Sequence, residues 1–120
     1  MIAIQNRTLD GRETNSLKAN VYDDGLLRVE YDNYYIALRG EMVRIQRAEF
    51  LVVCRLVQKS ERFVLAEELW DYIWGTQRKF NKLSIRVYVS RVRQLLEPFG
   101  IKIENMPNVG YRFIPHSKSQ

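Results

Sequence analysis

The apolar residues of this chain change their spacing twice, and this change constrains the fold more than any other feature of the sequence. Between Val21 and Ile45 apolar and polar residues alternate, which is the period of a strand. From residue 47 to about residue 97 the apolar residues recur at intervals of three and four, which is the period of a helix. Alternation returns after Gly100. The pattern predicts strands, then helices, then strands.

The first alternating region predicts three or four short strands in a small antiparallel sheet. Turn signals divide it at 23–25, 32–33 and 39–40, where Asp, Asn and Gly cluster. The alternating apolar residues are Leu27, Val29, Tyr31, Tyr34, Ile36, Leu38, Val43 and Ile45. Residues 1–20 show no period and are interpreted as a flexible tail or linker.

Three helices are expected next, over about 47–59, 66–74 and 84–97. Gly75 should end the second helix, and Ser84 is a plausible N-cap of the third. Residues 76–84 are expected to form a loop. The alternating segments 101–104 and 111–114, joined by a turn, predict a carboxyl-terminal hairpin, and residues 116–120 a frayed tail.

The positive charge is concentrated in one segment. The 120-residue chain has a formal net charge of +5, which alone does not identify a partner. Residues 76–94, however, contain six basic residues and no acidic one, so this segment carries +6 and the remainder −1. The basic residues are Arg78, Lys79, Lys82, Arg86, Arg91 and Arg93.

The third helix separates an apolar stripe from a polar face. At about 100° per residue, Ile85, Val89, Val92 and Leu96 share the stripe. Arg86, Ser90, Arg93 and Gln94 point away from it, and Arg91 lies on the flank. Such a face suits the major groove, where Arg pairs with guanine and Gln with adenine. A solvated charged face is the alternative, but such faces usually mix both signs.

Enzymatic function finds no support in the sequence. The single cysteine, Cys54, lies in an apolar run and is expected to be a small buried hydrophobe. The single histidine, His116, lies near the end of the chain. Asp23 and Asp24 are paired only in sequence. No metal-ligand spacing or phosphate-binding glycine loop occurs, so no cofactor and no metal are expected. Without a bilayer-spanning apolar run or a signal sequence, the expected location is cytoplasmic.

Four short motifs occur in order from Glu49 to Arg112: Glu49-Phe50, Trp74-Gly75, Arg91-Val92-Arg93 and Gly110-Tyr111-Arg112. With them, residues 21–115 resemble the OmpR/PhoB-type winged-helix effector domain of bacterial response regulators. The resemblance implies an α+β fold, a winged helix-turn-helix with an amino-terminal antiparallel sheet and a hairpin wing. It also implies sequence-specific binding to double-stranded DNA by a transcription regulator of a two-component system. The third helix would enter the major groove, with the wing and basic loop on the phosphates.

The sequence departs from the family pattern at several positions. Gln46 and Leu65 stand where the family often has a Thr or Ser N-cap. Leu83 stands where Arg is common, and Arg86 where an acidic residue is common. These two exchanges should change the DNA sequence that is bound and leave the docking mode unchanged. The wing turn has Pro107-Asn108 in place of the usual minor-groove Arg, and Asn tolerates the left-handed conformation of a tight turn.

The expected DNA-binding residues lie on the third helix, the basic loop and the wing, with Arg91 and Arg93 leading. They are Arg86, Ser90, Arg91, Arg93, Gln94, Lys79, Lys82, Asn108 and Arg112. The loop also aligns with the family's RNA polymerase contact, for which Arg78, Phe80 and Asn81 are candidates. Phe80 could equally pack on its own domain. Trp74 could approach the DNA backbone, although a core role suits its ring better.

Two further questions stay open at the level of sequence. The resemblance implies pairing of protomers on repeated half-sites, and the chain could be an excised effector domain or a stand-alone regulator. A different class of function is a protein-interaction module on a winged-helix scaffold, docking on RNA polymerase or a partner regulator and barely touching DNA. The missing helix caps and wing Arg leave room for that alternative.

Overall fold

The computed structural model describes residues 20–116. The predicted tail of residues 1–20, apart from Asn20, and residues 117–120 of the predicted frayed end lie outside the described residues. The predicted α+β class is confirmed. The chain divides into two compact units, one ending at Met42 and the other beginning at Val43.

The amino-terminal unit contains a sheet with strand order β1-β2-β3-β4. Its strands are Val21–Asp23, Leu27–Glu30, Tyr35–Leu38 and Glu41–Val43, so the expected small sheet is confirmed with four strands. Val29 pairs with Tyr22 on one side and Ile36 on the other, and both neighbours run antiparallel to it. Asp24 does not belong to a strand: its Oδ1 accepts backbone hydrogen bonds from Leu26 and Leu27, which fixes the first turn.

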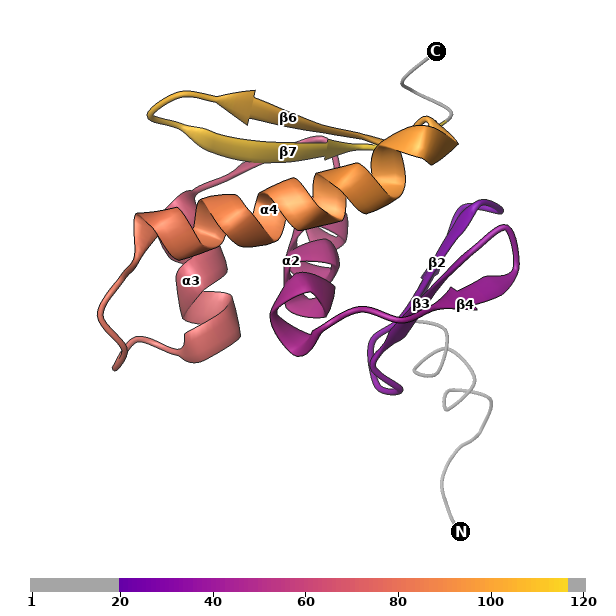
Figure 1. Ribbon diagram of the computed structural model, residues 1–120, viewed down its shortest axis with the longest axis horizontal. Coiled ribbons are helices and arrows are strands. Elements are labelled where there is room, and N and C mark those ends of the chain that lie inside the picture. The colour runs from indigo at the N-terminus through magenta and orange to yellow at the C-terminus, as the bar shows by residue number, and fades with distance from the viewer. Residues whose placement is uncertain (1–19, 117–120) are drawn as a thin grey trace, which may run out of the picture. The chain divides into compact units, whose positions relative to one another are not determined.

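The second unit contains helices α2, Arg47–Gln58, α3, Ala66–Trp74, and α4, Lys82–Leu96. The predicted spans of α2 and α3 are confirmed within one residue. Helix α4 packs on both α2 and α3, as Figure 1 shows, and a short 3₁₀ turn, Glu97–Phe99, follows it. The apolar stripes meet in the core of this unit. Its helical part includes Phe50, Val53, Cys54, Val57, Leu69, Ile73, Ile85, Val89, Val92 and Leu96, all buried.

Cys54 is part of this core, with 1% of its surface exposed. Desolvation by the surrounding apolar side chains raises the pKa of its thiol to about 12. A thiol held neutral and shielded from solvent is a poor nucleophile. The interpretation of Cys54 as a buried hydrophobe is therefore confirmed.

The predicted start of the third helix is wrong. Helix α4 begins at Lys82, and its N-cap is Asn81, whose side-chain oxygen accepts a hydrogen bond from the backbone N–H of Ser84 at 3.1 Å. Ser84 thus occupies the third position of the helix and not its cap. The physical reason is that the Asn81 amide satisfies a backbone donor that the first turn leaves without a partner. Lys82 and Leu83 consequently lie on the helix instead of in the loop.

Helix α3 begins at Leu65 without a side-chain cap, as its sequence predicts. Helix α2 begins differently from the weak cap that the sequence predicts, because Gln46 and Glu49 form a capping box. In this box Glu49 Oε1 accepts the backbone N–H of Gln46 at 3.3 Å.

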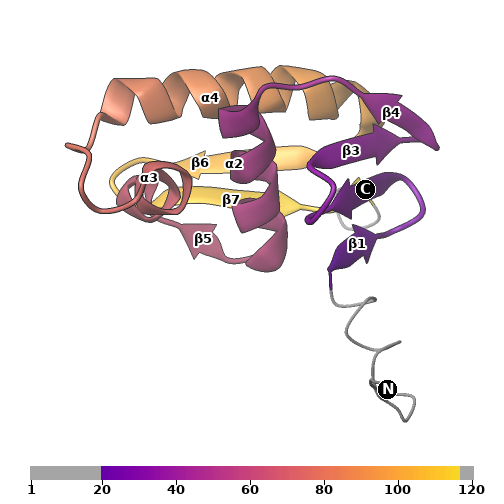
Figure 2. The ribbon, with the colours of Figure 1, turned by 90° about the horizontal axis from the view of Figure 1, so that it is seen from below.

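The carboxyl-terminal hairpin is confirmed, but it belongs to a larger sheet than predicted. Strands β6, Lys102–Met106, and β7, Gly110–Ile114, pair antiparallel, and β5, Phe63–Val64, adds to the other edge of β7. Figure 2 shows the three strands together. Sequence alternation missed β5 because two residues are too few to show a period.

Gly110 permits the approach of β5 to β7. Its φ is 153°, and a Cβ there would lie 2.1 Å from the carbonyl oxygen of Val64. Only glycine fits so close to another backbone. Asn108 in the preceding turn has φ 64°, in agreement with the predicted left-handed conformation.

Candidate nucleic-acid interface

The outward face of α4 lies opposite its buried stripe. At about 100° per residue, the centre of that face falls at Leu83, Val87, Ser90 and Gln94. Leu83 and Val87 are 69% and 45% exposed. The centre of the face therefore carries two apolar and two uncharged polar side chains. The arginines lie on its two flanks.

Lys82 and Arg86 hold the flank nearer the wing. Both are exposed, and within residues 20–116 neither has an ion pair or a side-chain hydrogen bond. They line a groove of about 460 Å³ together with Phe80, residues 65–67 at the start of α3, which include the acidic Glu67, and residues 105–111 around the turn of the β6–β7 hairpin, the wing. Two unpaired cations beside a groove are available to bind an anionic ligand.

Arg93 has a different environment from the one its sequence position suggests. Its Nε and Nη2 both donate to the carbonyl oxygen of Ile103 in β6, at 3.1 and 3.0 Å. Glu97 lies 3.8 Å from Nε, and the side chain is only 29% exposed. Arg93 therefore links β6 of the wing to α4. Its guanidinium supplies the hydrogen-bond donors that a neighbouring strand would otherwise give to the Ile103 carbonyl oxygen.

Arg91 occupies the opposite flank, towards α2. Its Nη1 lies 3.4 Å from Glu49 Oε2, and 54% of its side chain is exposed. The pair is weak in geometry and open to solvent, so an anion of higher charge can compete for this arginine. Ser90 is half-buried and Gln94 exposed between the two flanks.

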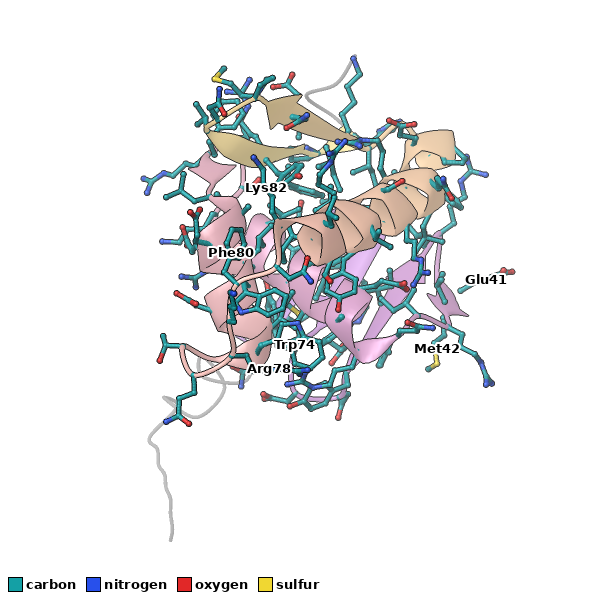
Figure 3. All side chains as sticks on the ribbon, turned by 60° about the vertical axis from the view of Figure 1, so that its left-hand side comes forward. Glu41, Met42, Trp74, Arg78, Phe80 and Lys82 are labelled. Carbon is teal, nitrogen blue, oxygen red and sulfur yellow. The ribbon has the colours of Figure 1, made fainter. Side chains whose placement is uncertain are left out.

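Helix α3 ends in a cluster of an indole and two guanidinium groups. The Arg78 guanidinium lies over the Trp74 ring, 4.2 Å from its centroid, and that of Arg47 lies 5.7 Å from it. Figure 3 shows Trp74 and Arg78 next to each other, with Phe80 and Lys82 further along. The Trp74 Nε1 is buried and makes no hydrogen bond among the described residues. Trp74 therefore supports two cations with its ring and does not offer its N–H to the surface.

Phe80 packs back on its own domain. It is half-buried, and its ring meets Trp70 edge-on with centroids 6.0 Å apart. The loop is fixed further by Trp70, whose Nε1 donates to the carbonyl oxygen of Arg78 at 2.9 Å. Of the proposed polymerase contacts, Phe80 is thus a loop anchor and Asn81 a helix cap, while Arg78 is exposed.

The wing turn presents few charges of its own. Arg112 is held on β7, where its Nε donates to Glu104 Oε1 at 3.0 Å and its guanidinium lies 4.6 Å from the Phe63 ring centroid. Asn108 is exposed at the turn. Arg112 therefore lies among neighbours of its own sheet, whereas Asn108 is free to contact a ligand.

The sequence interpretation omitted Arg47, which the fold brings beside Trp74 from the start of α2. Its signal was available, since Arg47 stands off the apolar face of its helix. Lys79 lies exposed in the loop as expected. Across the described span 20–116, no group of three or more His, Cys, Asp or Glu is arranged to hold a metal ion, and no helix is long and apolar enough to cross a bilayer.

The fold and the basic helix define a class of protein: a winged helix of the kind used by DNA-binding transcriptional regulators, which are not enzymes. Residues 40–113 match the family described as "Transcriptional regulatory protein, C terminal", which is more than half of the chain. The chain belongs to this family, and the resemblance to the OmpR/PhoB type is confirmed.

Individual relatives agree with this assignment. Response regulator ArlR of Staphylococcus haemolyticus is 23% identical over 94 residues, which are 77% of this chain and 43% of ArlR. Transcriptional regulatory protein VxrB of Vibrio cholerae is 29% identical over 77 residues, 64% of this chain and 31% of VxrB. The chain thus spans less than half the length of these curated relatives.

Solved structures show the same fold. The Klebsiella pneumoniae RstA DNA-binding domain, crystallised with the RstA box, has a TM-score of 0.69 and 25% identity, covering 80% of this chain and 98% of that domain. Response regulator DrrB of Thermotoga maritima, an OmpR/PhoB homologue, has a TM-score of 0.67 and 21% identity, covering 87% of this chain and 50% of DrrB.

Proposed function

We propose that this domain binds specific sites in double-stranded DNA as part of a bacterial transcription regulator, with α4 in the major groove. The observation that carries the proposal is the segment 76–94, which holds +6 without an acidic residue and forms the basic loop and the solvent-facing side of α4. The RstA domain of the same fold was crystallised with its DNA box, which supports this use of the scaffold.

The contacts of each arginine on α4 suggest a different role in DNA binding for each. Arg86 has no partner among the described residues and is positioned to donate a bidentate pair to a guanine edge. Arg91 can leave Glu49 for a phosphate or a base. Arg93 contributes indirectly, because it holds the wing beside α4. Ser90 and Gln94 face outward between the flanks and serve as polar base contacts.

Phosphate contacts would come from the cations around the loop and the wing. Lys79 and Lys82 are exposed, and Arg47 and Arg78 stand together on the Trp74 ring. Asn108 can add a polar contact from the wing turn. These groups carry affinity without sequence information, so binding should be strongly salt-dependent.

The test is selection of bound sequences from a random duplex library, followed by titration of the selected duplex. Recovery of a defined motif is expected, with log K falling by about 0.9 per log unit of salt for each phosphate neutralised. Arg62→Ala, an exposed cation outside the basic segment, is the control and should leave affinity unchanged. Failure to bind any duplex at micromolar protein in low salt would overturn the proposal and favour the protein-interaction alternative.

Two partners complete the proposal. RNA polymerase remains a partner of the loop, with exposed Gln77, Arg78 and Lys79 as its contacts, since Phe80 is packed inward. We also propose that protomers pair on repeated half-sites, as the family resemblance implies. A regulator that acts in this way on the bacterial chromosome works in the cytoplasm.

A further inference from the structure

Two apolar side chains occupy the centre of the outward face of α4. Leu83 and Val87 are 69% and 45% exposed and stand four positions apart, so they lie one above the other on that face. Lys82, Arg86 and Arg91 flank them, and no acidic residue occurs from 76 to 94. The result is a short apolar strip bordered by cations.

Folding of the domain does not account for this strip. Neither side chain belongs to the buried core, so each gains only part of the free energy that full burial would give. Val87 is β-branched and is a poorer helix former than the Ala or Lys usual on an exposed helical face. Isolated exposed apolar residues are common on proteins, but here two are stacked at the centre of a face whose flanks carry charge of a single sign.

We propose that Leu83 and Val87 contact the C5-methyl groups of thymines and so select A·T base pairs in the DNA site. The inference rests on the proposed function, with α4 in the major groove. Only thymine projects a methyl group into that groove, and apolar side chains recognise it by direct contact. The flanking cations fit the phosphates on either side of the groove, which supports duplex DNA as the occupant of the strip.

The spacing of the two side chains limits where the thymines can be. Four helical residues span about 6 Å along the axis, and successive base pairs are about 3.4 Å apart. The two thymine methyl groups should therefore lie on base pairs about one or two steps apart, on either strand. Arg86, one position before Val87, should then contact a guanine or a phosphate beside them.

The experiment uses a duplex selected from the random library, in which each thymine is replaced in turn by deoxyuridine. This change removes one methyl group and retains the Watson–Crick pair. Loss of the contact should weaken binding of the native domain by about three- to fivefold at one or two positions of a half-site. Leu83→Ala and Val87→Ala should each lose the thymine preference at its own position, while Val87→Thr, which keeps a methyl group, should retain it.

Met42→Ala is the matched control, because Met42 is 70% exposed but belongs to the amino-terminal sheet unit. It should keep the thymine preference at every position. A selected motif that tolerates deoxyuridine everywhere would overturn the inference and leave the proposed function intact. A preference that survives in both alanine variants would also overturn it, since it would then come from DNA shape. Absence of any selected motif would instead be a failure of the proposed function.

Discussion

The two halves of α4 carry similar charge but use it differently. In the first half, Lys82 and Arg86 are exposed and have no side-chain partner among residues 20–116, and Leu83 and Val87 stand bare beside them. In the second half, Arg93 is bound to the wing backbone. All four basic residues contribute equally to the net charge of the helix. Their contacts within the domain differ, and these contacts determine which side chains are available to bind a ligand.

The difference implies a division of labour along the helix. In the proposed complex the first half is available for the major groove, whereas in the second half Arg93 contacts β6 and Arg91 contacts α2. Arg91 stands between these roles, because its pair with Glu49 is long and exposed. Substitutions in the first half should therefore alter DNA binding, and those in the second half should alter stability first.

The largest effect is expected from Arg93→Ala. The change removes two charge-assisted hydrogen bonds to Ile103 and leaves a strand carbonyl without its partner, which should lower the free energy of unfolding by about 1.5–3 kcal/mol. Urea unfolding measures the loss, and faster amide exchange in β6 locates it. Arg93→Lys should recover part of the stability. Unchanged stability together with a large loss of DNA affinity would contradict the division of labour.

Arg86→Ala should have the next largest effect, on DNA binding instead of stability. Loss of a bidentate base contact should weaken binding to the selected site by about 1–3 kcal/mol. The side chain is exposed and unpaired within the described residues, so the free energy of unfolding should change by less than about 0.5 kcal/mol. Fluorescence anisotropy and urea unfolding give the two quantities. A lower free energy of unfolding with unchanged DNA affinity would contradict this prediction and show that Arg86, like Arg93, stabilises the fold.

A smaller effect is expected at the start of the helix. Asn81→Ala removes the acceptor for the Ser84 N–H and should cost about 0.5–2 kcal/mol of stability. Asn81→Asp keeps an acceptor and should keep stability, but its negative charge beside Lys82 should weaken DNA binding. Circular dichroism and anisotropy separate the two outcomes. Equal affinity for the native domain and the Asp variant would show that this turn lies away from the phosphates.

The smallest effect is expected from Arg91→Ala. An exposed pair of this kind contributes about 0–1 kcal/mol to stability, so unfolding should hardly change. If Arg91 transfers to a phosphate in the complex, the slope of log K against log salt should fall by about 0.9. A normal slope would show that Arg91 stays with Glu49 when DNA is bound.

The sequence determined the order of the elements other than β5, because each of these has a repeating pattern of its own. Alternation predicted the amino-terminal sheet and the hairpin, and the spacing of Phe50, Val53 and Val57 predicted α2 within one residue. The concentration of charge in residues 76–94 is likewise a property of sequence alone. Periodicity and charge are local, so they can be read without knowing which segments meet.

Only the tertiary structure decided what each basic residue contacts. Arg93 reaches Ile103 from ten positions away, and Arg47 meets Trp74 from the start of another helix. Strand β5 exists because Phe63 and Val64 find β7, not because of a pattern of their own. The N-cap of α4 is Asn81 and not the predicted Ser84, because the helix begins at Lys82. A hydrogen bond or ring contact needs its partner in place, and the partner is brought there by the fold.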